Sequence, residues 1–208
     1  HLFHFKINRN YYLKLYIFNH KCLLKLANPK KFMRKERKTR PRWDEYFMFN
    51  ALWIATRSSC QHLQTGAVIV KDRRIIAAGY NGAGPGIPNC REIGCRKEDC
   101  GVAFDDKGKA VCRGVHAEVN AMAERSKEEL KGAVMYTVYS PCSSCAKEIQ
   151  VRKLSEVVYL THYNEPDSLT KETFEKAQIY LTQFPLDQYS DFLKSNFERI
   201  RQIAHNIK

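Results

Sequence analysis

Apolar residues recur along the chain at two spacings, one typical of helices and one typical of strands. Four apolar side chains between Phe47 and Ala55 follow the helical spacing, which predicts a helix over residues 43–58. Two short runs rich in β-branched residues come next, at 66–70 and 74–80, with three polar residues between them. Strand-like runs this close together predict an antiparallel hairpin.

The same alternation continues to the end of the chain. Further helices are predicted at 115–126, 141–154, 170–176 and 186–207, and further strands at 133–139, 157–161 and 179–184. Residues 81–88 are predicted to be a loop because they contain three glycines and two prolines. Strands that alternate with helices predict an α/β fold.

Residues 89–113 follow neither spacing and are rich in Gly, Asp, Lys and Cys. A loop of this length requires a function or an internal cross-link that holds it in place, here called a staple. The chain has eight cysteines and no recognisable secretory signal. Metal or catalytic use of these thiols is therefore favoured over disulfides, and we expect a cytoplasmic protein.

The first 32 residues differ in composition from the rest of the chain. They contain seven basic and no acidic residues, begin with His and show no helical stripe, and Met33 follows them. We interpret 1–32 as a non-native or disordered leader, 33–185 as one domain and 186–208 as an amphipathic C-terminal helix. A transit peptide is the alternative for 1–32, although the segment is poor in Ser and Arg.

The net charge of +13 by itself favours a nucleic-acid partner. Removing the seven charges of the first 32 residues leaves +6, which makes that partner less favoured. Hydrophobic content of 44% and charged content of 27% are ordinary for a globular domain. No run approaches the roughly 18 apolar residues of a membrane helix, so we expect no membrane span.

Two short motifs carry the candidate chemistry, His116-Ala117-Glu118 and Cys142-Ser143-Ser144-Cys145. One imidazole and two thiolates are three ligands for Zn²⁺, one fewer than a closed structural site needs. The open position can hold a water whose pKa the metal lowers. Glu118 supplies a carboxylate that can carry its proton.

The spacing within each motif constrains where it can lie. Residues two apart on a helix point about 200° away from each other, so His116 and Glu118 converge only at the first turn of a helix. Cys142 and Cys145 are three apart and share one face of the helix that Pro141 is predicted to open. The positive N-terminal end of that helix favours thiolates.

Each motif also has an ordinary explanation. His-x-Glu is common by chance, and Cys-x-x-Cys is also typical of redox pairs and of half a structural zinc knuckle. Both motifs together, each at a helix start with a strand between them, favour a catalytic zinc. This combination is the signature of zinc deaminases.

From Arg40 to about Leu160 the chain resembles the deoxycytidylate (dCMP) deaminases of the CMP/dCMP-type zinc-dependent family. The two zinc motifs belong to the whole superfamily, whereas the segments Trp43-Asp44-Glu45-Tyr46-Phe47-Met48 and Gly79-Tyr80-Asn81-Gly82 narrow the resemblance to nucleotide deaminases. Besides the two zinc motifs, the segments that carry the resemblance are Arg40-Pro41-Arg42-Trp43-Asp44-Glu45-Tyr46-Phe47-Met48, Arg57-Ser58-Ser59-Cys60, Thr65-Gly66-Ala67-Val68-Ile69-Val70, Gly79-Tyr80-Asn81-Gly82 and Cys112-Arg113-Gly114-Val115.

The resemblance implies a cytidine-deaminase-like three-layer fold, a mixed five-stranded sheet flanked by helices. It implies hydrolysis of dCMP to dUMP and ammonia, the work of a hydrolase acting on a cyclic amidine. His116, Cys142 and Cys145 would hold the catalytic Zn²⁺, whose hydroxide attacks C4, and Glu118 would shuttle the proton.

Two substrate contacts are also implied by the resemblance. The backbone of Ala117 would hold the base, and Asn81 would hydrogen-bond the deoxyribose. A second interpretation of Asn81 stays open, because Asn among glycines also tolerates a left-handed turn.

A bacterial and phage subset of these deaminases is similar to this chain at four further cysteines and carries a second, structural zinc. These cysteines are Cys60, Cys90, Cys95 and Cys112. Four thiolates would close such a site and supply the staple that residues 89–113 need. Cys100 could replace Cys95 in this set. Free buried cysteines are the alternative.

The chain departs from the family pattern at two positions remote from the zinc motifs. The family usually ends a helix with glycine where Val151-Arg152-Lys153-Leu154 stands here, and Gln178 stands where glycine is common. These departures bear on loop detail and subunit packing.

Two other functions compete with this one. A tRNA adenosine deaminase shares both zinc motifs but has no cysteine-rich insert, and a non-enzymatic zinc module linked to DNA uptake would not need Glu118. The resemblance further implies a small nucleotide substrate, dCTP and dTTP as possible allosteric effectors, and a homo-oligomer, either hexamer or dimer.

Overall fold

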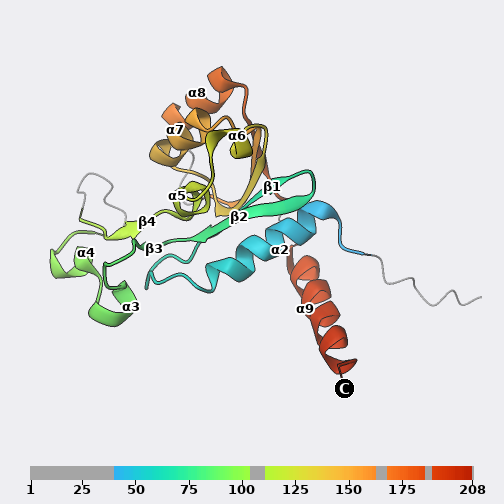
Figure 1. The fold of residues 1–208 in the computed structure, drawn as a ribbon. Coiled ribbons are helices and arrows are strands. Elements are labelled where there is room, and N and C mark those ends of the chain that lie inside the picture. Colours follow the sequence, from blue (N-terminus) through green and yellow to red (C-terminus); the bar gives the residue numbers. More distant parts are fainter. Residues whose placement is uncertain (1–39, 104–110, 163–167, 186–188, 208) are drawn as a thin grey trace, which may run out of the picture. The chain divides into compact units, whose positions relative to one another are not determined.

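A mixed five-stranded sheet forms the centre of the fold, with strand order β2-β1-β5-β6-β7 (Figure 1). The computed structural model describes residues 40–103, 111–162, 168–185 and 189–207, and the predicted leader and the predicted domain boundary at Met33 lie outside them. The strands of the sheet are β1 (Gly66–Lys71), β2 (Arg74–Tyr80), β5 (Val134–Tyr139), β6 (Glu156–Thr161) and β7 (Tyr180–Gln183).

The pairing of these strands follows from how they are connected. β1 pairs antiparallel with both β2 and β5, whereas β5–β6 and β6–β7 are parallel. Parallel neighbours need a crossover, and a helix lies between each of these pairs in the sequence. Asp72 and Arg73 have φ values of 52° and 60°, as the two-residue turn of a tight hairpin requires. The predicted hairpin and mixed sheet are confirmed.

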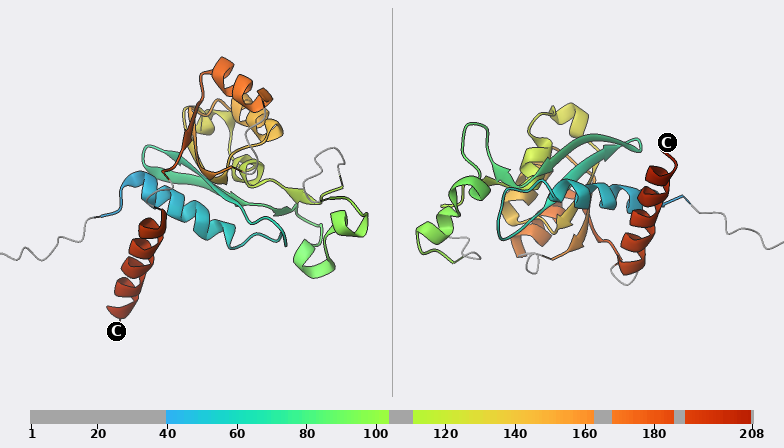
Figure 2. Two further views of the ribbon diagram at one scale, coloured as in Figure 1. Left: turned by 180° about the vertical axis from the view of Figure 1, so that it is seen from behind. Right: turned by 90° about the horizontal axis from the view of Figure 1, so that it is seen from below.

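The described helices lie on both faces of the sheet, apart from α3 and α4, which lie beyond one end of it (Figure 2). They are α2 (Trp43–Ala55), α3 (Cys90–Ile93), α4 (Arg96–Asp99), α5 (Ala117–Met122), α6 (Lys127–Leu130), α7 (Ser143–Val151), α8 (Ser168–Ala177) and α9 (Tyr189–His205). Two short strands, β3 (Gly82–Ala83) and β4 (Gly114–Val115), form a separate antiparallel pair.

Strand β1 shows how the sheet divides the core in two. Side chains of successive strand residues point to opposite faces. Ala67 and Ile69 accordingly pack in a cluster with residues of α5, α7 and α8, while Val68 and Val70 pack in a second cluster with residues of α2 and α9. The near-continuous apolar run of β1 therefore reflects burial on both sides.

Two glycines set how closely helices approach the sheet. A Cβ on Gly79 would lie 2.3 Å from the backbone nitrogen of Ala121 in α5, and one on Gly66 would lie 2.3 Å from the carbonyl oxygen of Ala51 in α2. These contacts leave no room for a side chain. Gly79 thereby lets β2 lie directly against α5, the helix that carries one of the candidate motifs.

The predicted helix over 115–126 is shorter in the structure. Val115 belongs to β4, where it pairs with Gly82. The helix stops at Met122 because a second start comes soon after it: Glu129 N–H donates to Ser126 Oγ at 3.2 Å, and Ser126 N–H donates to the Glu129 carboxylate at 2.9 Å. This capping box begins α6 as a separate helix.

The insert at 89–113 contains helices that the sequence did not predict. α3 and α4 have four residues each, which is too short for an apolar periodicity to appear. Asn89 precedes α3, and its N–H donates to the Glu92 carboxylate at 3.3 Å. Part of the predicted loop 81–88 is likewise strand β3.

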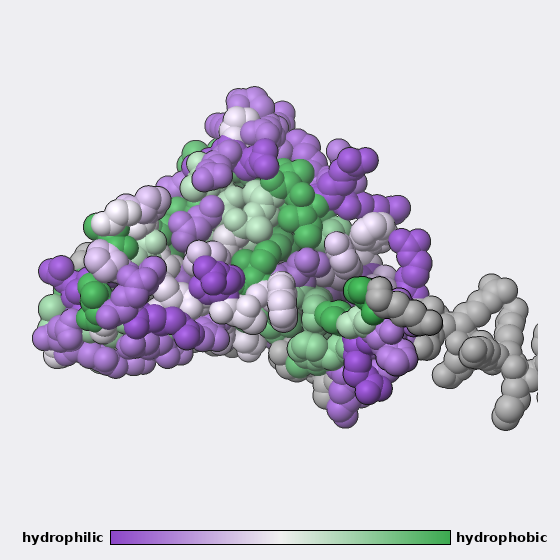
Figure 3. Space-filling model, turned by 60° about the horizontal axis from the view of Figure 1, so that its bottom comes forward, coloured by the Kyte–Doolittle hydropathy of each residue, from purple (hydrophilic) through white to green (hydrophobic). Residues whose placement is uncertain are grey.

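The C-terminal helix α9 is confirmed as amphipathic. Phe192 is buried against Phe184 and Phe49, whereas Phe197 and Ile203 are 53% and 65% exposed. Hydrophobic residues form a band on the face shown in Figure 3, bordered by hydrophilic ones. Within the described residues, no helix is long and apolar enough to span a membrane.

The two positions at which this chain lacks the family's usual glycine lie directly after helices, where glycine is common. Lys153 follows α7 with φ 59°, and Gln178 follows α8 with φ 57°. After α7, the N–H of Lys153 donates to the carbonyl oxygen of Gln150 at 3.0 Å, and the N–H of Leu154 donates to that of Ile149 at 3.3 Å. An equivalent pair of hydrogen bonds follows α8. This is the Schellman arrangement, in which the left-handed position favours glycine.

Lys153→Gly and Gln178→Gly are therefore each expected to stabilise the protein by about 0.5–1 kcal/mol. The left-handed conformation costs a side-chain-bearing residue about 1–2 kcal/mol, which exceeds the entropy that glycine adds to the unfolded state. Thermal unfolding should show a Tm higher by about 1–4 °C. Lys147→Gly, at an exposed position inside α7, is the control and should lower the Tm. An unchanged or lower Tm for Lys153→Gly contradicts the expectation.

Candidate active site

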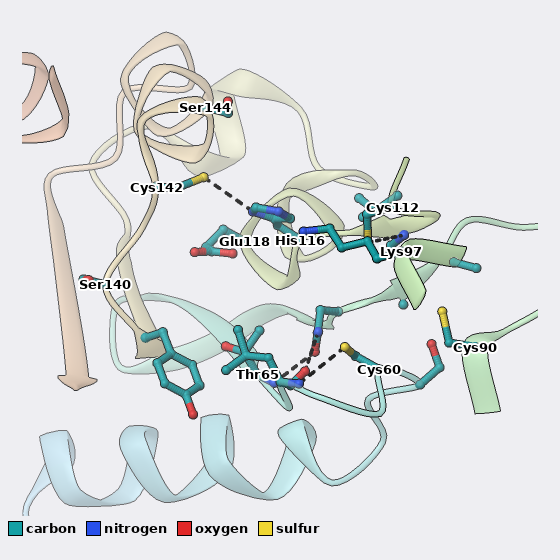
Figure 4. A pocket seen from close by; sticks show the side chains of 18 of the residues that line it. Cys60, Thr65, Cys90, Lys97, Cys112, His116, Glu118, Ser140, Cys142 and Ser144 are labelled. Carbon is teal, nitrogen blue, oxygen red and sulfur yellow. Dashed lines mark hydrogen bonds between the residues drawn. The ribbon is translucent and has the colours of Figure 1, made fainter. Parts of the chain in front are cut away.

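His116 and Glu118 lie at the start of α5. His116 is the N-cap residue with an extended backbone (φ −69°, ψ 151°), and Glu118 is the second residue of the helix. Both side chains line one cavity, as Figure 4 shows. The expectation that residues two apart converge at a first helical turn is confirmed.

Cys142 and Cys145 lie at the start of α7. Cys142 is the N-cap residue (φ −77°, ψ 169°), and Cys145 is the third residue of the helix. The prediction that Pro141 opens this helix was wrong, because the extended backbone of Cys142 delays the first turn to Ser143. The two thiols nevertheless share the first turn, where the positive end of α7 favours thiolates.

The structure brings the ligand atoms of these two helix starts together. Nδ1 of His116 lies 3.2 Å from Sγ of Cys145 and 3.5 Å from Sγ of Cys142. The three ligand atoms all lie within 4.8 Å of one another. Tetrahedral zinc with ordinary bond lengths would separate an imidazole nitrogen from a thiolate sulfur by about 3.6 Å. The three residues therefore fit Zn²⁺, with Nδ1 as the ligating nitrogen of His116.

Burial of Glu118 and the hydrogen bond between the two thiols are the main causes of the pKa shifts at the site. Glu118 is 6% exposed, and its burial raises the pKa of the carboxyl group above the usual range, although its own backbone N–H and His116 oppose the shift. The Cys145 thiol donates to Cys142 and so holds the pKa of Cys142 well below the usual range, with a further contribution from His116. The pKa of Cys145 is raised in return. The pair thus favours one thiolate.

The cavity beside these groups has a volume of about 460 Å³. It extends from the two helix starts to the insert, and Lys97 of α4 and Cys112 lie in its wall (Figure 4). Small-molecule sites commonly measure about 300–1,000 Å³. The cavity is therefore of a size that holds a small ligand with its reacting atom near Glu118.

Asn81 lines the cavity and also braces its wall. Its Oδ1 accepts hydrogen bonds from Ser58 Oγ at 2.6 Å and from Thr65 N–H at 2.9 Å, and its Nδ2 donates to Leu63 O at 2.7 Å. Asn81 is not among the described residues with positive φ, so its interpretation as a left-handed turn residue was wrong. A contact from Asn81 to deoxyribose stays a prediction.

Ala117 lies between two residues that line the cavity but is not in the lining itself. It is fully buried as the first residue of α5. Its predicted backbone contact with a base is a prediction that the structure does not test.

The four cysteines of the predicted second zinc site lie near one another, but their sulfur atoms do not form a compact set of ligands. Cys60, Cys90 and Cys112 line the cavity, and burial together with the nearby Cys95, Cys112 and Cys60 raises the pKa of Cys90. The four sulfur atoms are not among the described sets of ligand atoms that lie within 4.8 Å of one another. Cys100 is exposed.

His62 and Glu98 were not found from the sequence as partners of Cys95. The three residues bring their ligand atoms within 4.8 Å of one another, with His62 Nε2 only 2.8 Å from Glu98 Oε1. No local pattern around His62 gave a signal of this contact. Lys97 was missed as well, because its helix is too short to be predicted.

Comparison with known proteins agrees with this geometry. The model of the cytidine and deoxycytidylate deaminase zinc-binding region matches residues 41–161. The deoxycytidylate deaminase of Mycobacterium phage D29 is 41% identical over 123 residues, which cover 58% of this chain and 96% of the phage protein. The deoxycytidylate deaminase of Schizosaccharomyces pombe is 36% identical over 183 residues, covering 86% of this chain.

The match to the Schizosaccharomyces pombe protein spans only 53% of that protein's length. Among solved structures, dCMP deaminase from the cyanophage S-TIM5, in complex with dCMP and dUMP, superimposes with a TM-score of 0.57 at 26% identity. That match covers 70% of this chain and 99% of the cyanophage chain.

Proposed function

The chain belongs to the cytidine and deoxycytidylate deaminase zinc-binding family, and we propose that it hydrolyses dCMP to dUMP and ammonia. One observation carries the proposal: Nδ1 of His116 and the two sulfurs of Cys142 and Cys145 meet within 4.8 Å at a cavity that Glu118 lines. The deoxycytidylate deaminases to which the chain is similar, and the nucleotide complex of the cyanophage enzyme, support dCMP as substrate.

His116, Cys142 and Cys145 would hold the catalytic Zn²⁺. When bound, the metal supplies Lewis acidity that makes water a nucleophile near neutral pH. The protein's contribution is the set of three ligand atoms, which the starts of α5 and α7 bring within 4.8 Å of one another. Cys145 is 1% exposed, so bulk water does not reach this ligand.

Glu118 is the proposed proton carrier. Its buried carboxyl group has a raised pKa, so it can accept a proton from the attacking water and release it again. Glu118 would pass one proton of the attacking water to N3 of the cytosine ring, where it stays in the product, and the other, from the new hydroxyl group on C4, to the departing amine. One water is consumed, the C4–N bond breaks, and ammonia leaves.

The contacts that orient the substrate are also proposed. Asn81 would hydrogen-bond the deoxyribose, and the backbone of Ala117 would hold the base. Asn81 is suited to this role because its side chain is already fixed by Ser58 and Leu63. A fixed amide loses little side-chain entropy when it binds a ligand.

A second, structural zinc is proposed for the insert, held by Cys60, Cys90, Cys95 and Cys112. The mutual influence of these thiols on the pKa of Cys90 supports their closeness, and the metal would draw the sulfur atoms together. We further propose 33–185 as the deaminase domain and 186–208 as an added helix. A cytoplasmic homo-oligomer regulated by dCTP and dTTP completes the proposal.

A panel of substrates tests this function. The zinc-loaded protein is assayed for ammonia release from dCMP, dCTP, CMP, cytidine and a tRNA stem-loop, each with and without dCTP as an effector. The highest kcat/KM is expected for dCMP. Preference for the tRNA stem-loop would establish the tRNA adenosine deaminase instead, and no release from any substrate would favour a non-enzymatic zinc module.

A further inference from the structure

The side-chain amide of Asn81 is almost fully used by hydrogen bonds within the fold. Its Oδ1 accepts from Ser58 Oγ at 2.6 Å and from Thr65 N–H at 2.9 Å, and its Nδ2 donates to Leu63 O at 2.7 Å. A carboxamide oxygen has two lone pairs, and its nitrogen has two N–H groups. Within the part of the chain that the structure describes, the second N–H of Nδ2 is therefore left over, on a residue that lines the cavity.

The backbone partners of Asn81 determine which end of the amide faces which way. The N–H of Thr65 can only donate, and the carbonyl group of Leu63 can only accept, so exchanging Oδ1 and Nδ2 would break both hydrogen bonds. The position that remains is therefore a donor. A ligand that reaches Asn81 from the cavity must present an acceptor, such as an oxygen atom of a sugar.

Ser58 supports this amide from behind the cavity wall. It is 2% exposed and is not in the cavity lining. Its Oγ accepts the N–H of Cys60 at 3.2 Å, and its carbonyl oxygen accepts from Nε of Arg91 at 3.1 Å. The single hydroxyl proton goes to Oδ1 of Asn81 at 2.6 Å, since the carbonyl oxygen of Asn81 is farther away at 3.1 Å.

We propose that Ser58 is a positioning residue, whose hydroxyl group holds the Asn81 amide in the orientation that offers an N–H to the deoxyribose. This inference rests on the proposed function and on the contact proposed there for Asn81. Without the hydroxyl group, the amide loses one of the two partners of Oδ1 and gains rotational freedom, which substrate binding must then remove. Asn81 acts away from C4, so the effect should fall on KM rather than on kcat.

The first test compares steady-state kinetics of zinc-loaded variants. Ser58→Ala should raise KM for dCMP about 3- to 10-fold, the value of one neutral hydrogen bond, with kcat and zinc content at the wild-type values. Ser58→Thr and Ser58→Val have the same shape, but only threonine keeps the hydroxyl group, so KM should be about 3- to 10-fold lower for Ser58→Thr. Ser155→Ala is the control, since it removes a hydroxyl group that donates to Gly132 O at 3.0 Å, beyond the far end of α7, and should leave KM unchanged.

A double-mutant cycle separates positioning from a general structural role. If Ser58 acts through Asn81, adding Ser58→Ala to Asn81→Ala should change KM by less than about twofold. A further rise as large as in the wild-type background would mean that Ser58 acts elsewhere, for example through the N–H of Cys60, and would overturn the proposal. Calorimetry with dUMP repeats the cycle without turnover and should show the same pattern in the dissociation constant.

The outcomes distinguish this inference from the function on which it rests. If wild type neither deaminates dCMP nor binds dUMP, the proposed function has failed. If wild type deaminates dCMP, but Ser58→Ala keeps the wild-type KM or Ser58→Val and Ser58→Thr have equal KM values, only the role of Ser58 has failed.

Discussion

Glu118→Gln is expected to lower kcat for dCMP deamination by about 10²- to 10⁴-fold, the usual contribution of a positioned acid–base group. Glutamine fills the same space beside α5 but cannot exchange a proton with water, N3 or the leaving amine. Zinc content should stay at the wild-type value, because Glu118 is not among the three proposed ligands. Turnover of dCMP and elemental analysis of the same preparation provide the two measurements.

Glu148→Gln is the matched control for this change. Glu148 is an exposed carboxylate on α7 that lies 4.0 Å from Arg152, a long contact, so its loss should leave kcat unchanged. Full activity in Glu118→Gln would remove the proposed proton carrier. A simultaneous loss of zinc would mean that the variant reports on metal binding rather than on proton transfer.

Cys145→Ser and Cys90→Ser are expected to separate two metal ions with different roles. Cys145→Ser should bind one zinc ion fewer and lower kcat at least about 10³-fold, since it removes the metal that activates water. Cys90→Ser should also bind one zinc ion fewer but keep dCMP turnover and show a lower Tm, because a structural zinc contributes to folding directly. Elemental analysis, turnover and thermal unfolding are measured on each variant.

Cys100→Ser tests which cysteines form the second site. Cys100 is exposed and lies outside the proposed set, so both zinc ions should remain. If Cys100→Ser loses a zinc ion while Cys95→Ser retains both, Cys100 takes the place of Cys95. Equal metal content in wild type and Cys90→Ser would eliminate the second site.

The sheet and its main helices could be predicted because their elements are long enough to show a period. The run at 66–70 is apolar at successive positions because β1 is buried on both faces. Elements of two to four residues, such as β3 and α4, were missed because so short a segment shows no period. The boundary near Pro141 was misplaced because proline is also compatible with the extended residue that precedes a helix.

The candidate site could be predicted where its chemistry is local and not where it depends on tertiary contacts. His116 and Glu118 follow from the geometry of a first helical turn. The hydrogen bonds of Asn81 to Ser58 and Leu63 join residues 23 and 18 positions apart, so no local sequence pattern predicts them. Lys153 and Gln178 show the opposite case: the missing glycines were visible in the sequence, and the left-handed backbone persists there without them.

The N-cap positions of His116 and Cys142 restrict how the chain can change in evolution. Each residue is the hinge between an extended segment and a helix, and neither side chain caps its own helix. Adding or deleting one residue inside the first turn would rotate the remainder of the helix by about 100° and carry Glu118 or Cys145 out of the site. Changes of length should therefore be tolerated far from these two junctions, and the insert between β3 and β4 is a place where the chain can lengthen without moving them.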